Sequence, residues 1–464
     1  MNSTRPYLPL LFLCLFAVAR ADEPAFGLEE FKAGFDLDAG HIVHGEVGEN
    51  QLEFMHLNRN IVSLDQKAHY GERVDFEAGL MGVLWWPLSI AAIAPPEQRT
   101  LRVEPRLAVA KARFSFADDS TAYLEAGWFP YKYNRDASNL GEYLYRSGTY
   151  PGVVVTTNGY QLINHAAYDA YGVHFKHEML GGLIRHDVNL FLEEYILPIN
   201  DLTPGYEVSL NLPRFQMGLG AAYNRGISFQ PSATRPKSPE NSFVEVDSSA
   251  ASGAFKGPYL LAPTKIKNAV RTGDTTAIKY RITHRWTQRG AKLMARAALD
   301  LGFLLPEGRK GADDLRLFAE AAVLGLENQP FYYDKLSQRV PVMFGLNVPT
   351  FGLLDLLSVQ GERYTARFDD IKRQSELSLP VWLVPEWDVS GDPVESDYKP
   401  SHYARDDWKW SVYAKKTVNR LLAVHAQIAN DHMRLLTFNS AYTENTITST
   451  PKDWYYLVRL ECGI

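Results

Sequence analysis

The chain has 464 residues, a formal net charge of −6 at pH 7 and 12 % aromatic residues. Without a basic excess nothing points to nucleic acid as a partner, and two cysteines exclude a disulfide framework. Length alone suggests about two or three domains, but large β-barrels are an exception to that rule.

Residues 1–21 predict a cleaved secretory signal peptide. Arg5 precedes an apolar run over 8–18, and Ala19-Arg20-Ala21 is a small-x-small cleavage site. The apolar run is shorter than the ~20 residues that a spanning helix needs, so an uncleaved anchor is disfavoured. Cleavage would remove Arg5 and Arg20 and change the formal charge from −6 to −8.

The exported part, 22–464, is expected to be a single domain that is stabilised without disulfides or membrane-spanning helices. It keeps one thiol, Cys462, and has no run of about 18 uncharged apolar residues. Its aromatic residues and alternating segments fit two classes. One is a secreted all-β protein, and the other is an outer-membrane barrel, which closes its sheet because lipid cannot satisfy an open edge.

Runs in which apolar and polar residues alternate predict strands along the whole chain. The run at 74–80 leads into Trp85-Trp86, a pair that suits an aromatic girdle at a membrane interface, with packing in a soluble sandwich as the alternative. The run at 101–109 places its apolar residues at Leu101, Val103, Leu107 and Val109, on one predicted face. Further strands are expected at 121–129, 166–180, 184–193, 204–212, 215–228, 278–304, 315–326, 340–347, 353–368, 408–415, 424–431 and 454–461.

The run from Ile278 to Leu304 changes phase at Gly290, because its polar residues are odd-numbered before this glycine and even-numbered after it. Such a change needs either a hairpin turn or one bulged residue. A hairpin gives about seventeen strands and a bulge about sixteen, and bacterial single-chain barrels have even numbers. We therefore predict a bulge, and an all-β, antiparallel transmembrane β-barrel of about sixteen strands, within a range of about 14–18.

With this count the connections sort by length. The short turns at 117–120, 181–182, 213, 305–312, 348–352 and 418–420 fall on one side, and the long stretches 87–98, 130–165, 229–275, 367–406 and 438–451 fall on the other. Outer-membrane barrels have short periplasmic turns and long external loops, whereas a soluble sandwich has no reason to sort them. The sorting favours the bacterial outer membrane, with membrane lipid and the barrel assembly machinery as partners.

The charged residues opposite the apolar faces are expected to line the lumen, because Lys or Arg on the lipid face costs ~2–4 kcal/mol near the midplane. Cations outnumber anions in this set, which favours a lumen tolerant of anions. Arg–Glu ladders that only stabilise the wall are the alternative. The predicted wall residues are Arg102, Glu104, Arg106, Arg185, Asp187, Arg285, Arg296, Arg316, Glu320 and Lys409.

The stretch from Trp128 to Pro151 interrupts the strands with aromatic and charged residues. Asp136 is predicted to cap a short helix over 137–146, and Glu142 and Arg146 have the i, i+4 spacing of a helical ion pair. This composition suits a constriction that folds into the barrel, or a sugar-binding ledge. An external loop folded on its own aromatic residues is the alternative. The predicted constriction residues are Lys132, Tyr133, Arg135, Asp136, Glu142, Tyr145 and Arg146.

The sequence contains no G-x-S-x-G, H-E-x-x-H, C-x-x-C or P-loop motif, so we expect no enzyme, no cofactor and no metal site. The predicted function is a porin-like outer-membrane channel for passive diffusion of small hydrophilic solutes, narrowed by an inward loop at 130–150. One alternative is a non-conducting surface barrel that mediates adhesion or binds polysaccharide through loops 229–275 and 367–406. A less favoured one is an outer-membrane hydrolase using His165 and Asp169. Homo-oligomer formation is left open.

The alternation, the exported N-terminus and the loop in the first half resemble porin-type outer-membrane barrels. Three segments also resemble uncharacterised Fibrobacter-type outer-membrane proteins: Gly127 to Gly152 (GWFPYKYNRDASNLGEYLYRSGTYPG), Arg339 to Ser358 (RVPVMFGLNVPTFGLLDLLS) and Asp406 to Lys416 (DDWKWSVYAKK). The resemblance implies a barrel but no activity. Porin-type barrels usually end on an aromatic residue, whereas this sequence ends Leu460-Glu-Cys-Gly-Ile464, which puts recognition by the assembly machinery in doubt.

Overall fold

The computed structural model describes most of the strands and a part of the connections between them. The described residues are 26–47, 50–86, 100–116, 120–138, 140–145, 168–192, 201–229, 242–247, 258–261, 279–285, 290–307, 311, 313–326, 340–364, 407–431, 434–436, 444–446 and 452–463. The predicted signal peptide at 1–21 lies outside them.

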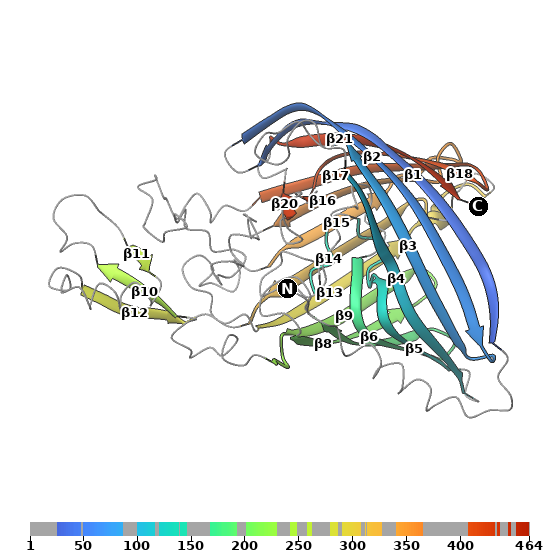
Figure 1. Cartoon of the computed structure of the whole chain (residues 1–464), viewed down its shortest axis with the longest axis horizontal. Helices are drawn as coiled ribbons and strands as arrows, with labels where there is room; N and C mark the ends of the chain where they lie inside the picture. The colour runs from blue at the N-terminus through green and yellow to red at the C-terminus, as the bar shows by residue number, and fades with distance from the viewer. Residues whose placement is uncertain are drawn as a thin grey trace.

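Within these residues sixteen antiparallel strands close into one barrel (Figure 1), which confirms the predicted fold and strand count. The first nine are β1 (Phe26–Val47), β2 (Asn50–Tyr70), β3 (Val74–Trp86), β4 (Thr100–Ser115), β5 (Thr121–Tyr131), β6 (Tyr168–Met179), β7 (Ile184–Leu192), β8 (Leu202–Asn211) and β9 (Phe215–Asn224). The other seven are β13 (Gly290–Asp300), β14 (Arg316–Leu324), β15 (Val342–Asn347), β16 (Leu356–Tyr364), β17 (Asp407–Asn419), β18 (Leu422–Asn430) and β21 (Trp454–Gly463).

The barrel wall is polar on its inner face and apolar on its outer face. On β14, Arg316 and Glu320 are buried while Leu317 between them is 41 % exposed. Leu293 on β13 and Val359 on β16 are likewise exposed apolar residues. A soluble protein buries such side chains, whereas a barrel in lipid presents them outward. Among the described residues no helix is long and apolar enough to cross a membrane.

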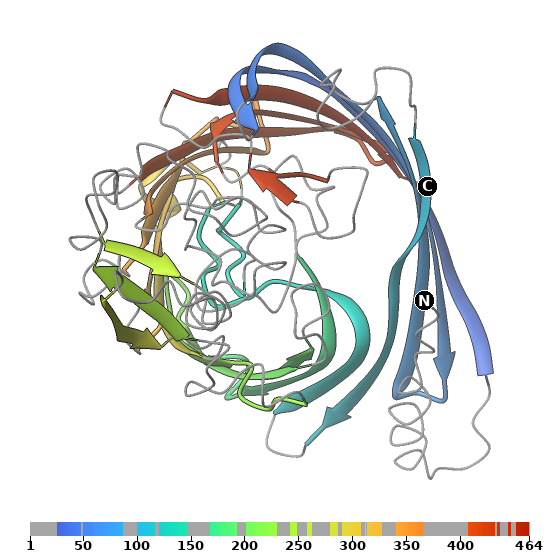
Figure 2. The same ribbon diagram turned by 60° about the vertical axis from the view of Figure 1, so that its left-hand side comes forward.

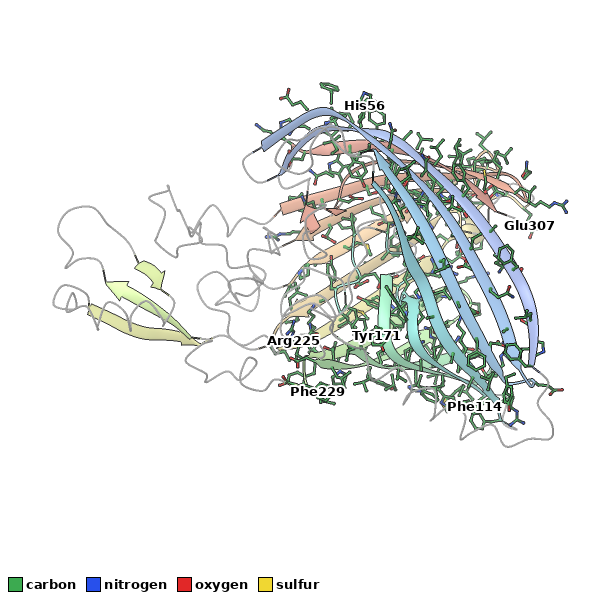
Figure 3. All side chains as sticks on the ribbon, viewed as in Figure 1. His56, Phe114, Tyr171, Arg225, Phe229 and Glu307 are labelled. Carbon is green, nitrogen blue, oxygen red and sulfur yellow. The ribbon has the colours of Figure 1, made fainter. Side chains whose placement is uncertain are left out.

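The connections separate by length between the two ends of the barrel. Figure 3 shows Phe114 and Glu307, beside short connections, at one end, and Arg225 and Phe229, where a long connection begins, at the other. Two connections depart from the predicted sorting: the link 48–49 lies at the end with the long connections, and the connection 301–315 at the other end is longer than 193–201. The short connections include 71–73, 116–120, 180–183, 212–214 and 420–421, and the long ones include 225–289 and 365–406.

The predicted single strand from Ile278 to Leu304 is wrong. Its first half is β12 (Lys279–Arg285), which pairs with β10 (Ser242–Asp247) in a separate three-stranded sheet completed by β11 (Pro258–Leu261). Gly290 is therefore the first residue of β13 and not a bulge. Arg285, predicted on the lumen wall, lies in β12 outside the barrel sheet. Two alternating runs that are close in sequence belong to different sheets, which a local pattern cannot distinguish.

Two further short elements complete the described structure. β19 (Arg434–Leu436) and β20 (Glu444–Thr446) form a two-stranded sheet, and η4 (Gly302–Leu304) is a 3-10 turn between β13 and β14. The stretches predicted as loops at 229–275 and 438–451 thus carry some strand structure.

A register irregularity in β4 corrects a second prediction. The pairing of β3 with β4 shifts between Gly79 and Leu80, so that Arg106 is the extra residue. Val103 is 69 % exposed, whereas Leu107 and Val109 are 6 % and 3 % exposed. The bulge reverses the phase of the strand, as a single inserted residue must. Leu107 and Val109 therefore do not share a face with Val103.

The strand pair that closes the barrel is joined by a buried ion cluster. β1 pairs with β21 from Gly34 opposite Gly463 to His44 opposite Trp454. Within this pair the Asp38 carboxylate accepts hydrogen bonds from Arg59 Nε at 2.8 Å and from Arg459 Nε at 2.6 Å. Asp38 and Arg59 are fully buried. One carboxylate thus connects β1, β2 and β21 where the two ends of the sheet meet.

We expect Asp38→Ala to destabilise the barrel by ~3–5 kcal/mol, because a buried arginine loses its carboxylate. Urea-induced unfolding in detergent micelles measures this loss. Lys32→Ala is the control, because the Lys32–Glu30 pair is exposed and its removal should cost less than ~1 kcal/mol. Equal effects of the two substitutions would contradict the assigned role of the cluster.

Candidate functional site

The segment that follows β5 leaves the wall and enters the barrel. Figure 2 shows it, in teal, inside the ring of strands. Residues 132–138 and 140–145 contain no helix, so the predicted helix over 137–146 is wrong. Gly141 and Glu142 have φ angles of 77° and 62°, in the left-handed region that a right-handed helix excludes. Wall side chains bind the backbone groups that helical hydrogen bonds would otherwise use.

Glu320 of β14 is the first of two wall carboxylates that hold the inward segment 132–145. One oxygen accepts hydrogen bonds from the Tyr133 hydroxyl at 2.6 Å and the Tyr143 N–H at 3.0 Å. The other accepts one from the Asn134 side-chain amide at 2.6 Å. Glu320 is almost fully buried, and hydrogen bonds to a buried carboxylate are among the stronger ones in proteins.

Glu362 of β16 holds the same segment from a neighbouring part of the wall. Its Oε2 accepts hydrogen bonds from the Gly141 N–H at 2.8 Å and the Tyr143 hydroxyl at 3.1 Å. Lys292 of β13 binds backbone carbonyl groups of the segment. Its Nζ donates to the Tyr143 carbonyl oxygen at 3.2 Å and to the Leu144 carbonyl oxygen at 3.4 Å. Buried wall groups of both signs therefore satisfy the donors and acceptors of one turn.

Asp136 does not cap a helix but forms a bidentate ion pair with Arg316 at the start of β14. The two nitrogen–oxygen distances are 2.6 Å and 2.9 Å. Gln360 donates to the Asp136 carbonyl and to Ser138 Oγ, both at 3.0 Å. Glu142 folds back to accept the Asn134 N–H at 2.6 Å. The predicted partner of Glu142, Arg146, lies outside the described residues.

An aromatic cluster holds Tyr145, the last described residue of the segment, against β7 and β8. The Tyr145 ring lies edge-on to Phe191 at 4.9 Å and to Tyr131 at 5.8 Å between centroids. Asn189 donates to the Tyr131 hydroxyl at 2.8 Å and to the Tyr145 hydroxyl at 3.3 Å. Burial, reinforced by the nearby Glu207 carboxylate, raises the pKa of Tyr145 well above its ordinary value. The Tyr145 phenol therefore stays neutral.

The exposed charge on the inward segment is cationic. Arg135 is 60 % exposed and lies 3.1 Å from Asp313 in the connection between β13 and β14. Lys132 is half-buried and donates to the Ala137 carbonyl. The two carboxylates of the segment, Asp136 and Glu142, are instead turned into contacts with the wall or the segment itself.

Apart from Arg285, which lies in β12 outside the barrel, the predicted wall residues fall into two groups. On the inner face lie Arg185, Asp187, Arg296, Arg316, Glu320 and Lys409, of which all but Arg185 and Arg296 are buried. The side chains of Arg102, Glu104 and Arg106 are outside the described residues, although Arg102 pairs with Val83 and Glu104 with Met81 in the register of β3 and β4.

Five residues that contact the segment, or Tyr131 just before it, were not predicted as site residues: Glu362, Gln360, Asn189, Phe191 and Glu207. Each is buried and alternates with more exposed positions of its strand, so the two-residue period was the one available signal. In the part of the chain that the structure describes, no group of three or more His, Cys, Asp or Glu is arranged to hold a metal ion.

No family model matches the sequence, and no curated protein matches it, so the resemblance to Fibrobacter-type proteins finds no support there. Similar solved structures include Pseudomonas putida OprB at high pH (12 % identity, 95 % of this chain and 94 % of that chain, TM-score 0.46). Salmonella typhi OmpF complexed with daunomycin is 9 % identical, over 95 % of this chain and 98 % of that chain, with a TM-score of 0.44. A mutant of Rh. blastica porin is 7 % identical, over 95 % of this chain and 100 % of that chain, with a TM-score of 0.39. The barrel assignment rests on the chain's own strand pairing.

Gly205→Ala should disturb the packing of the segment, because an added Cβ would lie 1.7 Å from the Tyr145 hydroxyl oxygen. We expect a loss of ~1–3 kcal/mol in the free energy of unfolding, as for an overpacked core. Urea titration in micelles measures it. Gly82→Ala is the matched control on β3, since its nearest neighbouring atom is 4.0 Å away. A stable Gly205→Ala variant would show that Tyr145 does not need this space.

Glu320→Gln should cost ~1–3 kcal/mol, because one carboxylate oxygen becomes an amide that cannot accept the Asn134 hydrogen bond. Tyr133→Phe removes a donor to the same carboxylate. In a double-mutant cycle the two losses should be non-additive by at least ~0.5 kcal/mol, as for residues in direct contact. Additive losses in urea unfolding would mean that Glu320 and Tyr133 act independently.

Proposed function

We propose that the protein is an outer-membrane channel for passive diffusion of small hydrophilic solutes, narrowed by the inward segment 132–145. The wall, which is polar inside and apolar outside, supports the membrane location. Exposed apolar residues such as Leu317 and Val359 alternate along it with buried polar residues. The end with the long connections would face the exterior. Membrane lipid and the barrel assembly machinery would be its partners.

A wet interior is supported by charged inner-wall residues that remain accessible to solvent. Glu77 on β3 and Lys111 on β4 form an ion pair at 2.8 Å, and their side chains are 27 % and 32 % exposed. Lys176 on β6 is 25 % exposed. Charges on a lipid face would be costly, so these side chains need water. A barrel of this width encloses an aqueous channel unless something fills it.

The observation that carries the constriction proposal is the docking of the segment on one part of the wall. Its described hydrogen bonds to the barrel reach β7, β13, β14, β16 and the connection at Asp313. They tie 132–145 to the wall on one side of the interior. A segment held in this way would narrow the channel without depending on loop motion.

Single-channel recording in planar bilayers tests the proposal. The wild-type protein should conduct, and the Glu320→Ala/Glu362→Ala variant should show larger or more variable conductance, because the segment loses its two carboxylate acceptors. Leu317→Ala, between inward positions of β14 but exposed on the outer face, should leave conductance unchanged. A folded protein that inserts but carries no current would refute the channel proposal.

A non-conducting surface barrel is the second candidate, and one observation favours it. The sheet of β10, β11 and β12 stands apart from the barrel at the end with the long connections (Figure 1). Such a sheet could bind polysaccharide. The hydrolase alternative depends on His165, which lies outside the described residues. Binding of envelope polysaccharide without conductance would favour the surface barrel.

A further inference from the structure

Three residues form a row across the inner wall near the short connections. Arg113 on β4 pairs with Tyr123 on β5, which pairs with Lys176 on β6. Directly paired residues of adjacent strands point to the same face. Lys176 in turn pairs with Asp187 of β7, whose inner face also carries Asn189 in contact with the inward segment. The row therefore faces the interior of the barrel.

The aromatic ring lies between two cations. The Arg113 guanidinium carbon is 5.5 Å from the centre of the Tyr123 ring, and Lys176 Nζ is 4.5 Å from it. Cation–π attraction fixes both side chains against the ring. A guanidinium stacked on a ring uses its flat face, while its N–H donors point outward in the plane of the group. Those donors remain available to another acceptor.

Arg113 differs from its neighbours in that it has no carboxylate partner among the described residues. On the adjoining inner face Lys111 binds Glu77 at 2.8 Å, and Lys176 binds Glu178 at 3.0 Å. Arg113 is exposed, and among the described residues no carboxylate lies within ion-pair distance of it.

The carboxylates of β5 and β7 are engaged elsewhere. Glu125 lies 3.8 Å from His174, and Asp187 binds His174 at 2.8 Å and Arg185 at 2.7 Å. Among the described residues, therefore, no carboxylate competes for the donors of Arg113, which lies exposed on the inner face.

From this geometry we infer that Arg113, held by Tyr123 and supported by Lys176, forms a binding site for small oxyanions on the inner wall. Phosphate and carboxylate groups fit, because their oxygens accept paired hydrogen bonds from a guanidinium edge. The inference deepens the proposed channel function by naming a solute class, small anions. Binding itself does not require that the channel conducts.

Line broadening of inorganic phosphate in ³¹P NMR, with the protein in detergent micelles, tests binding directly. Arg113→Gln should weaken binding ~3–10-fold, since a charged donor is lost at a partly exposed position. Glu178→Gln should strengthen it, because Lys176 loses its carboxylate partner. Opposite shifts identify an electrostatic site, whereas general damage to the wall would weaken binding in both variants.

Two further substitutions separate the ring from its hydroxyl. Tyr123→Phe keeps the aromatic face and should retain binding, and Tyr123→Leu should lose it. Lys416→Gln, an exposed cation beside the connection 348–355, is the control and should have no effect. Acetate competing with phosphate would show that the site accepts carboxylates as well.

Reversal potentials in planar bilayers complete the experiment. Anion preference that falls in Arg113→Gln is the expected result. Phosphate binding without conductance would overturn the channel proposal and leave the oxyanion site standing. Conductance together with no Arg113-dependent phosphate binding would overturn the site and leave the channel standing.

Discussion

The inward segment stays inside the barrel because buried wall side chains bind its backbone. Glu362 accepts the N–H of Gly141 and Glu320 that of Tyr143, and Lys292 donates to the carbonyls of Tyr143 and Leu144. These contacts join positions 148 to 221 residues apart in sequence. A buried carboxylate without donors is costly, and so is an unbonded buried N–H. The buried groups of the wall and the backbone groups of the segment therefore supply each other's hydrogen-bond partners.

The inner wall uses its charges differently on its two sides. On β13, β14 and β16 the buried residues Lys292, Glu320 and Glu362 bind the segment, whereas the ion pairs Lys111–Glu77 and Lys176–Glu178 on β3, β4 and β6 stay partly exposed. The first arrangement fixes a piece of chain in place. The second leaves water and ions as the remaining partners. Arg113 belongs to the second side, where a cation without a carboxylate is tolerated because solvent still reaches it.

The sequence predicted the barrel well because strand alternation is a local property that survives without knowledge of partners. The prediction failed at Arg106, where one extra residue reverses the alternation of inward and outward side chains along β4. It also failed before Gly290, because β12 alternates like a wall strand but belongs to a separate sheet. The strand count was right although the reasoning at Gly290 was wrong, since a bulged strand and a separate sheet both leave the barrel with one strand there. Apolar Leu107 and Val109 gave no sign of facing inward.

The inward segment shows more clearly what could not be predicted from the sequence. Its charges and tyrosines suggested a functional loop, and helical spacing then suggested an internal Glu142–Arg146 pair. The left-handed backbone at 141 and 142 could not be foreseen, because it depends on acceptors that strands much later in the chain provide. Local propensity decides a short helix only when nothing outside competes for its N–H groups. Here Glu320 and Glu362 compete, and two charged acceptors outweigh the few hydrogen bonds that one helical turn offers.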